Sequence, residues 1–186
     1  MPRTRHEVDR DDKVDEMLDA AERRLLAGGY AEMSVASIAR ELGVAQNSVY
    51  WYFPSKDHLF VAVLRRILAR TLSAKPPANR GLQRQVLWFT DRLHDFSPLR
   101  VTLRDRAGQS ELVAGFEREL YAALHQLVVH VFEAHVPADE LTLAARTLMA
   151  TVEGTFIADL SKAERHRVIT FALERLMAGT ETGSAV

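Results

Sequence analysis

The amino-acid sequence predicts an all-α protein of about nine helices, and three observations favour this fold class. Apolar residues recur at helical spacing along nearly all of the 186 residues. Glycine, proline and serine fall between the apolar runs, where helices end and begin. No segment has the convincing apolar–polar alternation of a strand. With 47% apolar and 26% charged residues, the chain has the composition of an ordinary globular protein.

The N-terminal part of the chain should form four helices. An apolar stripe over residues 14–25 predicts the first helix, and Gly28-Gly29 should stop it. Ser34 is placed to cap a short second helix, which Gly43 ends. The third and fourth helices are expected over about residues 46–52 and 56–72.

Five more helices are expected in the C-terminal part. Two prolines within the polar segment of residues 73–80 predict a loop. Pro98 after Ser97 is a helix-start signal, because proline fits the first helical position. Ser110 is placed to cap a long helix. The expected ranges are about residues 82–96, 97–107, 111–135, 139–160 and 161–177.

Composition excludes several classes of protein and site. The chain has no cysteine, so it has no disulfide, thiolate metal site or cysteine nucleophile. No apolar run approaches the roughly 18–20 residues of a membrane span, and residues 1–13 are too charged for a secretory signal. We therefore expect a cytoplasmic protein. The net charge of −1 does not by itself indicate a nucleic-acid partner, but residues 42–55 carry no charge and Lys56 follows directly.

The segment of residues 35–53 has the pattern of a helix-turn-helix. This motif needs a small residue where its two helices cross and a turn residue that tolerates positive φ. Ala39 and Gly43 supply them, four positions apart. The side chains expected to face inward are Ile38, Leu42, Val44 and Val49. Agreement over about twenty residues favours DNA binding over a purely structural hairpin.

Polar side chains suited to DNA lie on the second helix of this motif. Gln46, Asn47 and Ser48 occupy its first turn, with amide and hydroxyl groups that can hydrogen-bond base edges in a major groove. Lys56 begins the next helix, where its ammonium and the helix N-terminus could hold one phosphate together.

The segment GGYAEMSVASIARELGVAQNSVYWYFPSKDHLFVAVL resembles the DNA-binding domain of the tetracycline-repressor (TetR) family, over roughly residues 14–64. The resemblance implies phosphate contacts from Ser34 and Lys56. It also implies contacts to the DNA backbone or bases from Tyr50 and Tyr52 of the second helix of the motif, the reading helix. The full set of candidate DNA-binding residues is Ser34, Gln46, Asn47, Ser48, Tyr50, Trp51, Tyr52 and Lys56. Ala45 departs from the pattern, because family members often have a hydroxyl residue there that caps the recognition helix. That cap is expected to be missing.

Two domains and two disordered ends are expected. Residues 1–55 would form the DNA-binding helix-turn-helix domain, and residues 56–178 a helical ligand-binding and dimerisation domain. Residues 179–186 are predicted to be a disordered tail, and about residues 1–10 a disordered arm. Arg3, Arg5 and Arg10 give that arm an alternative role, which is to reach into an adjacent minor groove.

The resemblance implies a ligand pocket among the middle helices. On the helix of residues 82–96, Trp88 lies on the charged side with Arg84 and Asp91, which predicts that this helix is covered on all sides. The candidate pocket residues are Trp88, Phe89, Phe116, Tyr121, His125 and Thr151. Each of them could equally be ordinary core or surface. A small apolar or amphipathic ligand is expected.

The resemblance also implies a homodimer made by the last two helices. The candidate interface residues are Leu148, Val152, Phe156, Val168, Phe171, Ala172 and Leu176. Two such helices from each subunit would form a four-helix bundle around a two-fold axis. A dimer also suits the reading of a palindrome, because its two reading helices would lie one helical turn, ~34 Å, apart.

No catalytic or metal-binding pattern is found. His125, His130 and His135 follow at steps of five residues, and each step turns a helix by about 140°, so the three cannot share one metal. We expect no cofactor and no enzymatic activity. The expected function is that of a dimeric repressor that binds a palindromic operator and is released by a small molecule. A DNA-binding regulator without such a ligand and an all-α interaction module are the alternatives.

Overall fold

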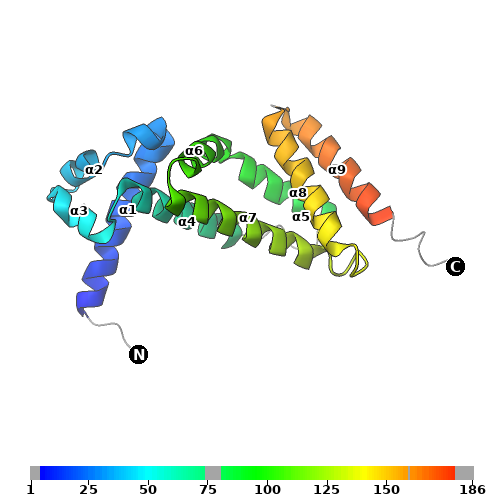
Figure 1. Ribbon diagram of the computed structural model, residues 1–186, viewed down its shortest axis with the longest axis horizontal. Coiled ribbons are helices and arrows are strands. Elements are labelled where there is room, and N and C mark those ends of the chain that lie inside the picture. Colours follow the sequence, from blue (N-terminus) through cyan, green and yellow to red (C-terminus); the bar gives the residue numbers. More distant parts are fainter. Residues whose placement is uncertain (1–4, 74–80, 159, 179–186) are drawn as a thin grey trace. The chain divides into compact units, whose positions relative to one another are not determined.

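A computed structural model describes residues 5–73, 81–158 and 160–178, and within them the protein consists of nine helices and contains no strand (Figure 1). The helices are α1 (Arg5–Glu32), α2 (Val35–Glu41), α3 (Gln46–Tyr52), α4 (Lys56–Ser73), α5 (Leu82–His94), α6 (Ser97–Ala107), α7 (Glu111–Phe132), α8 (Leu141–Ile157) and α9 (Lys162–Ala178). The predicted all-α class is therefore confirmed. No helix of the described part is both long enough and apolar enough to cross a membrane.

The described residues form two compact units. The first contains the chain up to Ser73 together with Pro98–Glu117, and the second contains the remainder up to Ser97 and from Arg118 onward. Helix α7 begins in the first unit and ends in the second. The predicted boundary between residues 55 and 56 remains a prediction about roles, because these units are defined by packing alone.

The first unit is built on the packing of α1 against α4 and of α2 against α3. Its core is apolar apart from Thr71, and its largest fully buried side chains include Leu25, Met33, Ile38, Val49, Leu59, Phe60, Val63 and Val113. Ala20 and Ala21 are completely buried on α1, and side chains this small allow a neighbouring helix to approach closely. Ion pairs surround this core, as when Arg66 of α4 bonds Asp19 and Glu22 of α1 at 2.5 and 3.0 Å.

Two features of α1 test the sequence analysis. The helix begins at Arg5, so Arg5 and Arg10 lie in a helix and not in a disordered arm, while Arg3 lies outside the described residues. Between Arg3 and Ala27 the sequence has no glycine or proline to interrupt a helix. The predicted stop at Gly28-Gly29 appears as a kink, because both glycines leave helical geometry and Gly29 has φ +72°.

The second unit contains the antiparallel pair α8 and α9, with α5 packed against α9. Its buried cluster consists of Phe132, Val136, Ala144, Leu148, Ile169 and Leu173. A polar contact joins α5 to α9 beside this cluster: Asp91 accepts from Lys162 Nζ at 2.8 Å and lies 2.9 Å from His166 Nε2. The predicted tail of residues 179–186 and nearly all of the predicted loop of residues 73–80 lie outside the described residues.

Candidate nucleic-acid interface

The turn between α2 and α3 has the geometry that the sequence predicts. Gly43 has φ +67°, a conformation that side chains with a Cβ rarely adopt. Its neighbour Val44 donates its backbone N–H to the carbonyl of Ala39 at 2.9 Å. Ala39 is only 2% exposed, so its methyl group is the surface on which the two helices cross. The helix-turn-helix therefore forms as its small residues require.

Both helices of the motif begin as predicted. The Ser34 hydroxyl accepts the Ser37 N–H at 3.5 Å, and so caps α2 from its extended N-cap position. Ala45 occupies the N-cap of α3 and makes no side-chain cap. The first turn of α3 therefore receives no bond from an N-cap side chain, and the Ser48 N–H bonds the Ala45 carbonyl at 2.9 Å instead.

The first turn of α3 presents its polar side chains to solvent. Gln46, Asn47 and Ser48 are all exposed, whereas Val49 directly after them is fully buried and anchors the helix on the core. Residues 42–55 contain no carboxylate, so neither α3 nor the turn before it places a like charge against a phosphate backbone.

The aromatic end of α3 is also open to solvent. Trp51 is 65% exposed and Tyr50 43% exposed, and Tyr52 meets Trp51 edge to face with the ring centroids 4.7 Å apart. Trp51 therefore presents a large aromatic ring to solvent one turn after the polar residues of α3.

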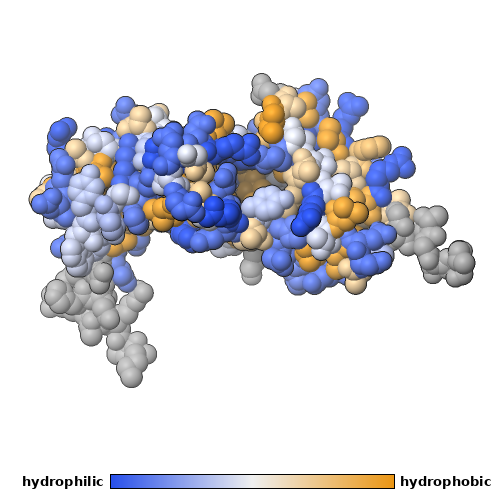
Figure 2. All heavy atoms as spheres, viewed as in Figure 1, coloured by the Kyte–Doolittle hydropathy of each residue, from blue (hydrophilic) through white to orange (hydrophobic). Residues whose placement is uncertain are grey.

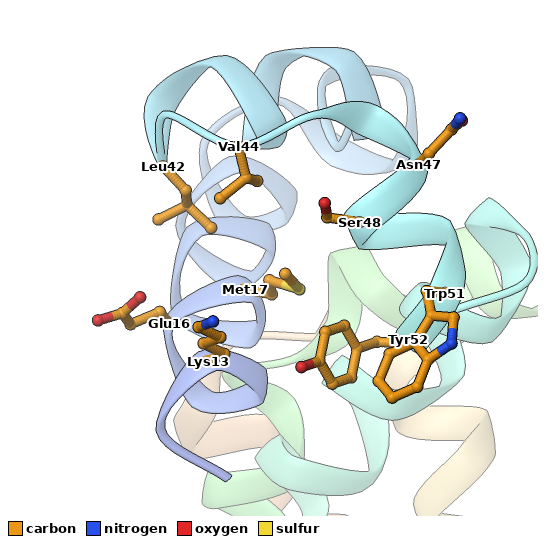
Figure 3. A pocket seen from close by; sticks show the side chains of 9 residues that line it. All are labelled: Lys13, Glu16, Met17, Leu42, Val44, Asn47, Ser48, Trp51 and Tyr52. Carbon is orange, nitrogen blue, oxygen red and sulfur yellow. The ribbon is translucent and has the colours of Figure 1, made fainter. Parts of the chain in front are cut away.

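A hollow of about 630 Å³ lies between α1 and α3. Its lining residues are Lys13, Glu16, Met17, Leu42, Val44, Asn47, Ser48, Trp51 and Tyr52 (Figure 3). Ser48 points toward α1 while Asn47 points away from the hollow (Figure 3).

The predicted inward face of the helix-turn-helix is wrong at two of its four residues, because Leu42 is only half-buried and Val44 is 36% exposed. Only Ile38 and Val49 of the predicted set are fully buried, since the short α2 and α3 cannot cover the turn between them.

Lys56 stands at the first turn of α4 beside a polar cluster. Its Nζ donates to the carbonyl of Ala31 at 3.3 Å and lies 4.2 Å from the centre of the Tyr30 ring. Burial, and then the nearby Arg106 guanidinium, hold the pKa of Lys56 below its ordinary value. The ammonium is therefore partly desolvated, which strengthens its attraction to an anion.

Asp57, the next residue, is the centre of that cluster. Tyr30 donates its hydroxyl to Asp57 at 2.6 Å, and Arg106 Nη2 donates to both carboxylate oxygens at 3.0 Å. Burial raises the pKa of Asp57, but the bonds from Tyr30, Arg106 and Ser110 outweigh it and keep the pKa below its ordinary value. Burial and then the bond to Asp57 raise the pKa of Tyr30 to about 12, so this hydroxyl stays a donor at neutral pH.

Comparison with known proteins assigns the helix-turn-helix to a family. A family model described as bacterial regulatory proteins, tetR family, matches residues 17–63, which run from α1 through α2 and α3 into α4. The helix-turn-helix segment is therefore similar to that of the TetR family. The proteins that this model describes are regulators.

Individual proteins resemble this chain in sequence over its N-terminal part or in fold over most of its length. The HTH-type transcriptional repressor KstR of Rhodococcus jostii is 37% identical over 73 residues, which are 38% of this chain and 34% of KstR. The chain thus spans about a third of the length of the curated relatives it matches. A transcriptional regulator from Rhodococcus has the same fold, with a TM-score of 0.73 at 18% identity over 89% of this chain and 96% of that one. A regulator from Saccharomonospora viridis in complex with choline gives 0.69 at 16% identity, over 88% and 96% of the two chains.

The candidate pocket residues are divided between the two units of the chain. Phe116 is buried in the first unit, with the Arg65 guanidinium 5.2 Å from its ring centre. The other five lie in the second unit, where Trp88, Phe89 and His125 are half-buried and Tyr121 is 56% exposed. The Thr151 hydroxyl donates to the carbonyl of Thr147, within its own helix.

The prediction that α5 is covered on all sides is wrong for the second unit taken alone. Arg84 and Arg92 are exposed on α5. The Arg92 guanidinium lies 4.9 Å from the Trp88 ring centre and covers it from one helical turn away. A tryptophan among charged residues is here explained by a cation–π contact within the helix.

The candidate interface residues also fall into two groups. Leu148 is 2% exposed and belongs to the unit's own core, while Val152 and Leu176 pack against that core. Phe156 stacks on His94 with the ring centroids 5.6 Å apart. Ala172 is half-buried. Val168 and Phe171 are the two that remain exposed, at 40% and 60%.

Sequence reasoning missed several residues of these surfaces. Leu143 and Ile157 are 69% and 72% exposed on α8, and their fourteen-residue separation, two heptads on one helix face, was a signal that could have found them. Asp57 and Arg106 are 49 positions apart, and no local pattern connects them. The place of Met17 in the lining of the hollow was not predicted either, because Met17 lies on α1 and no local pattern connects it with α3.

Proposed function

We propose that this protein is a transcriptional repressor that binds a palindromic DNA operator as a homodimer. The observation that carries the proposal is the exposed, carboxylate-free first turn of α3 within a TetR-family helix-turn-helix. The relative KstR, described as a repressor, supports repression as the direction of regulation.

The exposed side chains of the motif suit the parts of a DNA site. Gln46 and Asn47 carry amides that can both donate to and accept from one base edge, as adenine requires in the major groove. Lys56, with its partly desolvated ammonium, suits a phosphate contact that fixes the position of α3. Trp51 and Tyr50 offer flat faces to the sugars at the edge of the groove.

The dimer is proposed to form through the outer faces of α8 and α9. Orange, apolar spheres lie on the surface over these two helices (Figure 2). The exposed apolar residues there are Leu143, Ile157, Val168 and Phe171. Exposed side chains of this size are more than scattered surface residues, and a second copy of the helix pair would cover them in a four-helix bundle.

A small apolar or amphipathic molecule is proposed to release the protein from DNA. The choline bound to the similarly folded Saccharomonospora viridis regulator supports this, and quaternary ammonium groups are recognised over aromatic faces. Trp88 already holds a cation over its ring. The test is a thermal-shift screen that starts with choline, because a bound ligand raises the melting temperature. A compound that raises it and leaves DNA affinity unchanged contradicts release.

The main test is selection of bound duplexes from a random pool, followed by titration of the selected duplex and of random DNA at several salt concentrations. A specific regulator should prefer the selected duplex by a factor of about 10³ or more, and its affinity should fall with salt. A chain that selects no sequence, or whose affinity for DNA does not change with salt concentration, is not a DNA-binding repressor.

Lys56→Ala gives the corresponding prediction for phosphate binding. It should weaken binding to all sequences alike and lower the slope of log affinity against log salt by about one unit. Arg167→Ala removes an exposed cation from α9 and is the matched control. An unchanged slope for Lys56→Ala would show that this ammonium never meets DNA.

A further inference from the structure

The cluster at the start of α4 contains a residue that comes from outside the matched family segment. Arg106 lies at the end of α6, about forty residues beyond residue 63, yet α6 from Pro98 onward packs in the same compact unit as the helix-turn-helix. The Arg106 side chain is 23% exposed and that of its partner Asp57 17% exposed, so the pair is largely shielded from water. Arg106 Nη1 also bonds the Gln109 side chain at 2.8 Å, which fixes the guanidinium plane.

Asp57 places a carboxylate next to the ammonium that is proposed to bind phosphate. A carboxylate at this position has two unfavourable effects on DNA binding: it repels the phosphate, and it competes with the phosphate for Lys56. In the structure Asp57 is instead fully engaged by Tyr30 and Arg106, with Ser110 bonding it as well. Lys56 bonds a carbonyl, that of Ala31.

We propose that Arg106 is a positioning residue for DNA binding. It forms an ion pair with the Asp57 carboxylate and so keeps the Lys56 ammonium available for a DNA phosphate. This inference rests on the proposed function. It makes the end of α6 part of the phosphate-binding apparatus, although α6 contributes nothing to the helix-turn-helix itself.

Charge and geometry support this role together. Lys56, Arg106 and Asp57 leave one net positive charge at the start of α4, and removal of Arg106 leaves none. Both cations also lie over one ring, with Arg106 Cζ 4.7 Å and Lys56 Nζ 4.2 Å from the centre of Tyr30. Tyr30 in turn packs edge to face on the buried Phe60, so the ring that holds the ammonium is itself held by the core.

The competing explanation is that Arg106 only ties α6 to α4. The two explanations differ in what happens when Asp57 is neutralised as well. If Arg106 acts by neutralising Asp57, Arg106→Gln should be rescued by Asp57→Asn, because the double variant again carries one net positive charge on Lys56. If Arg106 is only a tie, the double variant should bind as weakly as Arg106→Gln, since the ion pair is absent in both.

The experiment titrates the full-length protein with a labelled DNA duplex of mixed sequence, about three helical turns long, over a series of salt concentrations. Arg106→Gln should weaken binding about as much as Lys56→Ala and lower the salt slope by about one unit. The double variant Asp57→Asn/Arg106→Gln should restore both, and Asp57→Asn alone should bind more tightly than the wild type. Arg104→Gln, which removes an exposed cation from the same helix, should keep the wild-type salt slope.

Each outcome decides between the explanations. Wild-type affinity and slope in Arg106→Gln, or a double variant as weak as Arg106→Gln, overturn the inference and leave the proposed function standing. A wild-type protein that binds no duplex overturns the proposed function itself. If Arg106→Gln does not fold, Asp57→Asn alone decides, because failure to tighten binding contradicts an inhibitory role of this carboxylate.

Discussion

At the scale of single residues, the reading helix separates anchoring from recognition within one turn. Val49 is completely buried, and its three predecessors are exposed. Substitution of an exposed polar side chain at this place should change DNA binding without changing the fold, because surface substitutions of this kind have small effects on stability.

Gln46→Ala and Asn47→Ala are therefore expected to act on recognition. Each should cost about 1–3 kcal/mol of binding free energy on the selected operator, since a bidentate amide–base contact is lost. Specificity should relax at particular base positions. The measurement is affinity for the operator and for a set of its single-base variants. Gln126→Ala, at an exposed position of α7, is the control. Equal losses on operator and random DNA would assign these amides to the backbone.

Residues whose roles depend on local geometry were predictable from the sequence. Gly43 and Ser34 were found because a left-handed turn and an N-cap each demand a particular residue type. The bonds of Asp57 to Tyr30 and Arg106 were not, because they join three helices. Charged residues pair with whichever partner the packing brings near, and sequence spacing carries no information about that.

At the scale of helices, Arg66 and Arg70 of α4 both pair with Glu22 of α1, and Arg66 is the more shielded of the two arginines. The Arg66 side chain is 20% exposed and that of Glu22 only 13% exposed, whereas Arg23, which pairs with Glu41, is 63% exposed. Shielded ion pairs with several hydrogen bonds contribute more to stability than exposed ones.

Arg66→Met should lower the free energy of unfolding of the first unit by about 1–2 kcal/mol, because Asp19 and Glu22 lose a charged partner. The chain has two tryptophans, and Trp51 lies in the first unit. Urea unfolding followed by Trp51 fluorescence in a Trp88→Phe background isolates this unit. Arg23→Met, the exposed counterpart, should change stability by well under 1 kcal/mol. Equal effects of the two variants would show that shielding is irrelevant here.

The contact between α5 and α9 should make the second unit sensitive to acid. Burial raises the pKa of Asp91, but bonds from Lys162 and His166 outweigh it and hold the pKa below its ordinary value. A carboxylate with a lowered folded-state pKa stabilises the fold above its unfolded pKa, about 3.9, and loses this contribution as pH falls through the folded value.

Asp91→Asn should therefore destabilise the second unit by about 1 kcal/mol at pH 7, and the difference from wild type should shrink as pH falls below about 4. Trp88 fluorescence in a Trp51→Phe background reports this unit. Asp95→Asn, at an exposed position just beyond the same helix, is the control. A difference that stays constant from pH 7 to acid would show that charge on Asp91 contributes nothing.

Apart from α1, the helix ranges were predicted within a few residues, because proline, glycine and serine mark ends locally. The start of α6 at Ser97 and the bounds of α3 agree with the prediction. The ends of α5, α7 and α8 were each predicted two or three residues too late, since apolar spacing continues past the last helical residue. The start of α1 at Arg5 was missed because a run of charges was taken to mean disorder.

At the scale of the whole molecule, the packing of α6 and the first turns of α7 with the helix-turn-helix could not be predicted from the sequence. The apolar residues Leu99, Leu103 and Val113 show that each of these helices buries one face, but many different helices could cover such a face. Periodicity identifies a face to be covered and leaves open what covers it. The same limit applies to the apolar outer faces of α8 and α9.

The dimer proposal is tested most directly at the exposed apolar residues of α9 and α8. Leu176 packs within the protomer and Phe156 stacks on His94, so an arginine at either position would disturb the fold as well as an interface. Phe171 and Ile157 are 60% and 72% exposed, so an arginine at either position leaves the protomer core intact, although Phe171 gives up the contact of its ring with the Arg175 guanidinium, 5.2 Å away.

Phe171→Arg and Ile157→Arg should each yield a folded monomer, because an interface between two copies would bury an unpaired charge on both sides of its two-fold axis. Light scattering over a range of concentrations measures the mass, and circular dichroism checks the helices. Tyr121→Arg, 56% exposed on α7, should leave the dimer intact. The monomers should also lose most of their affinity for a palindrome while keeping weak, salt-dependent binding to any duplex, because one reading helix contacts a single half-site. Two variants that remain dimers with wild-type operator affinity would place the interface on another face of the protein.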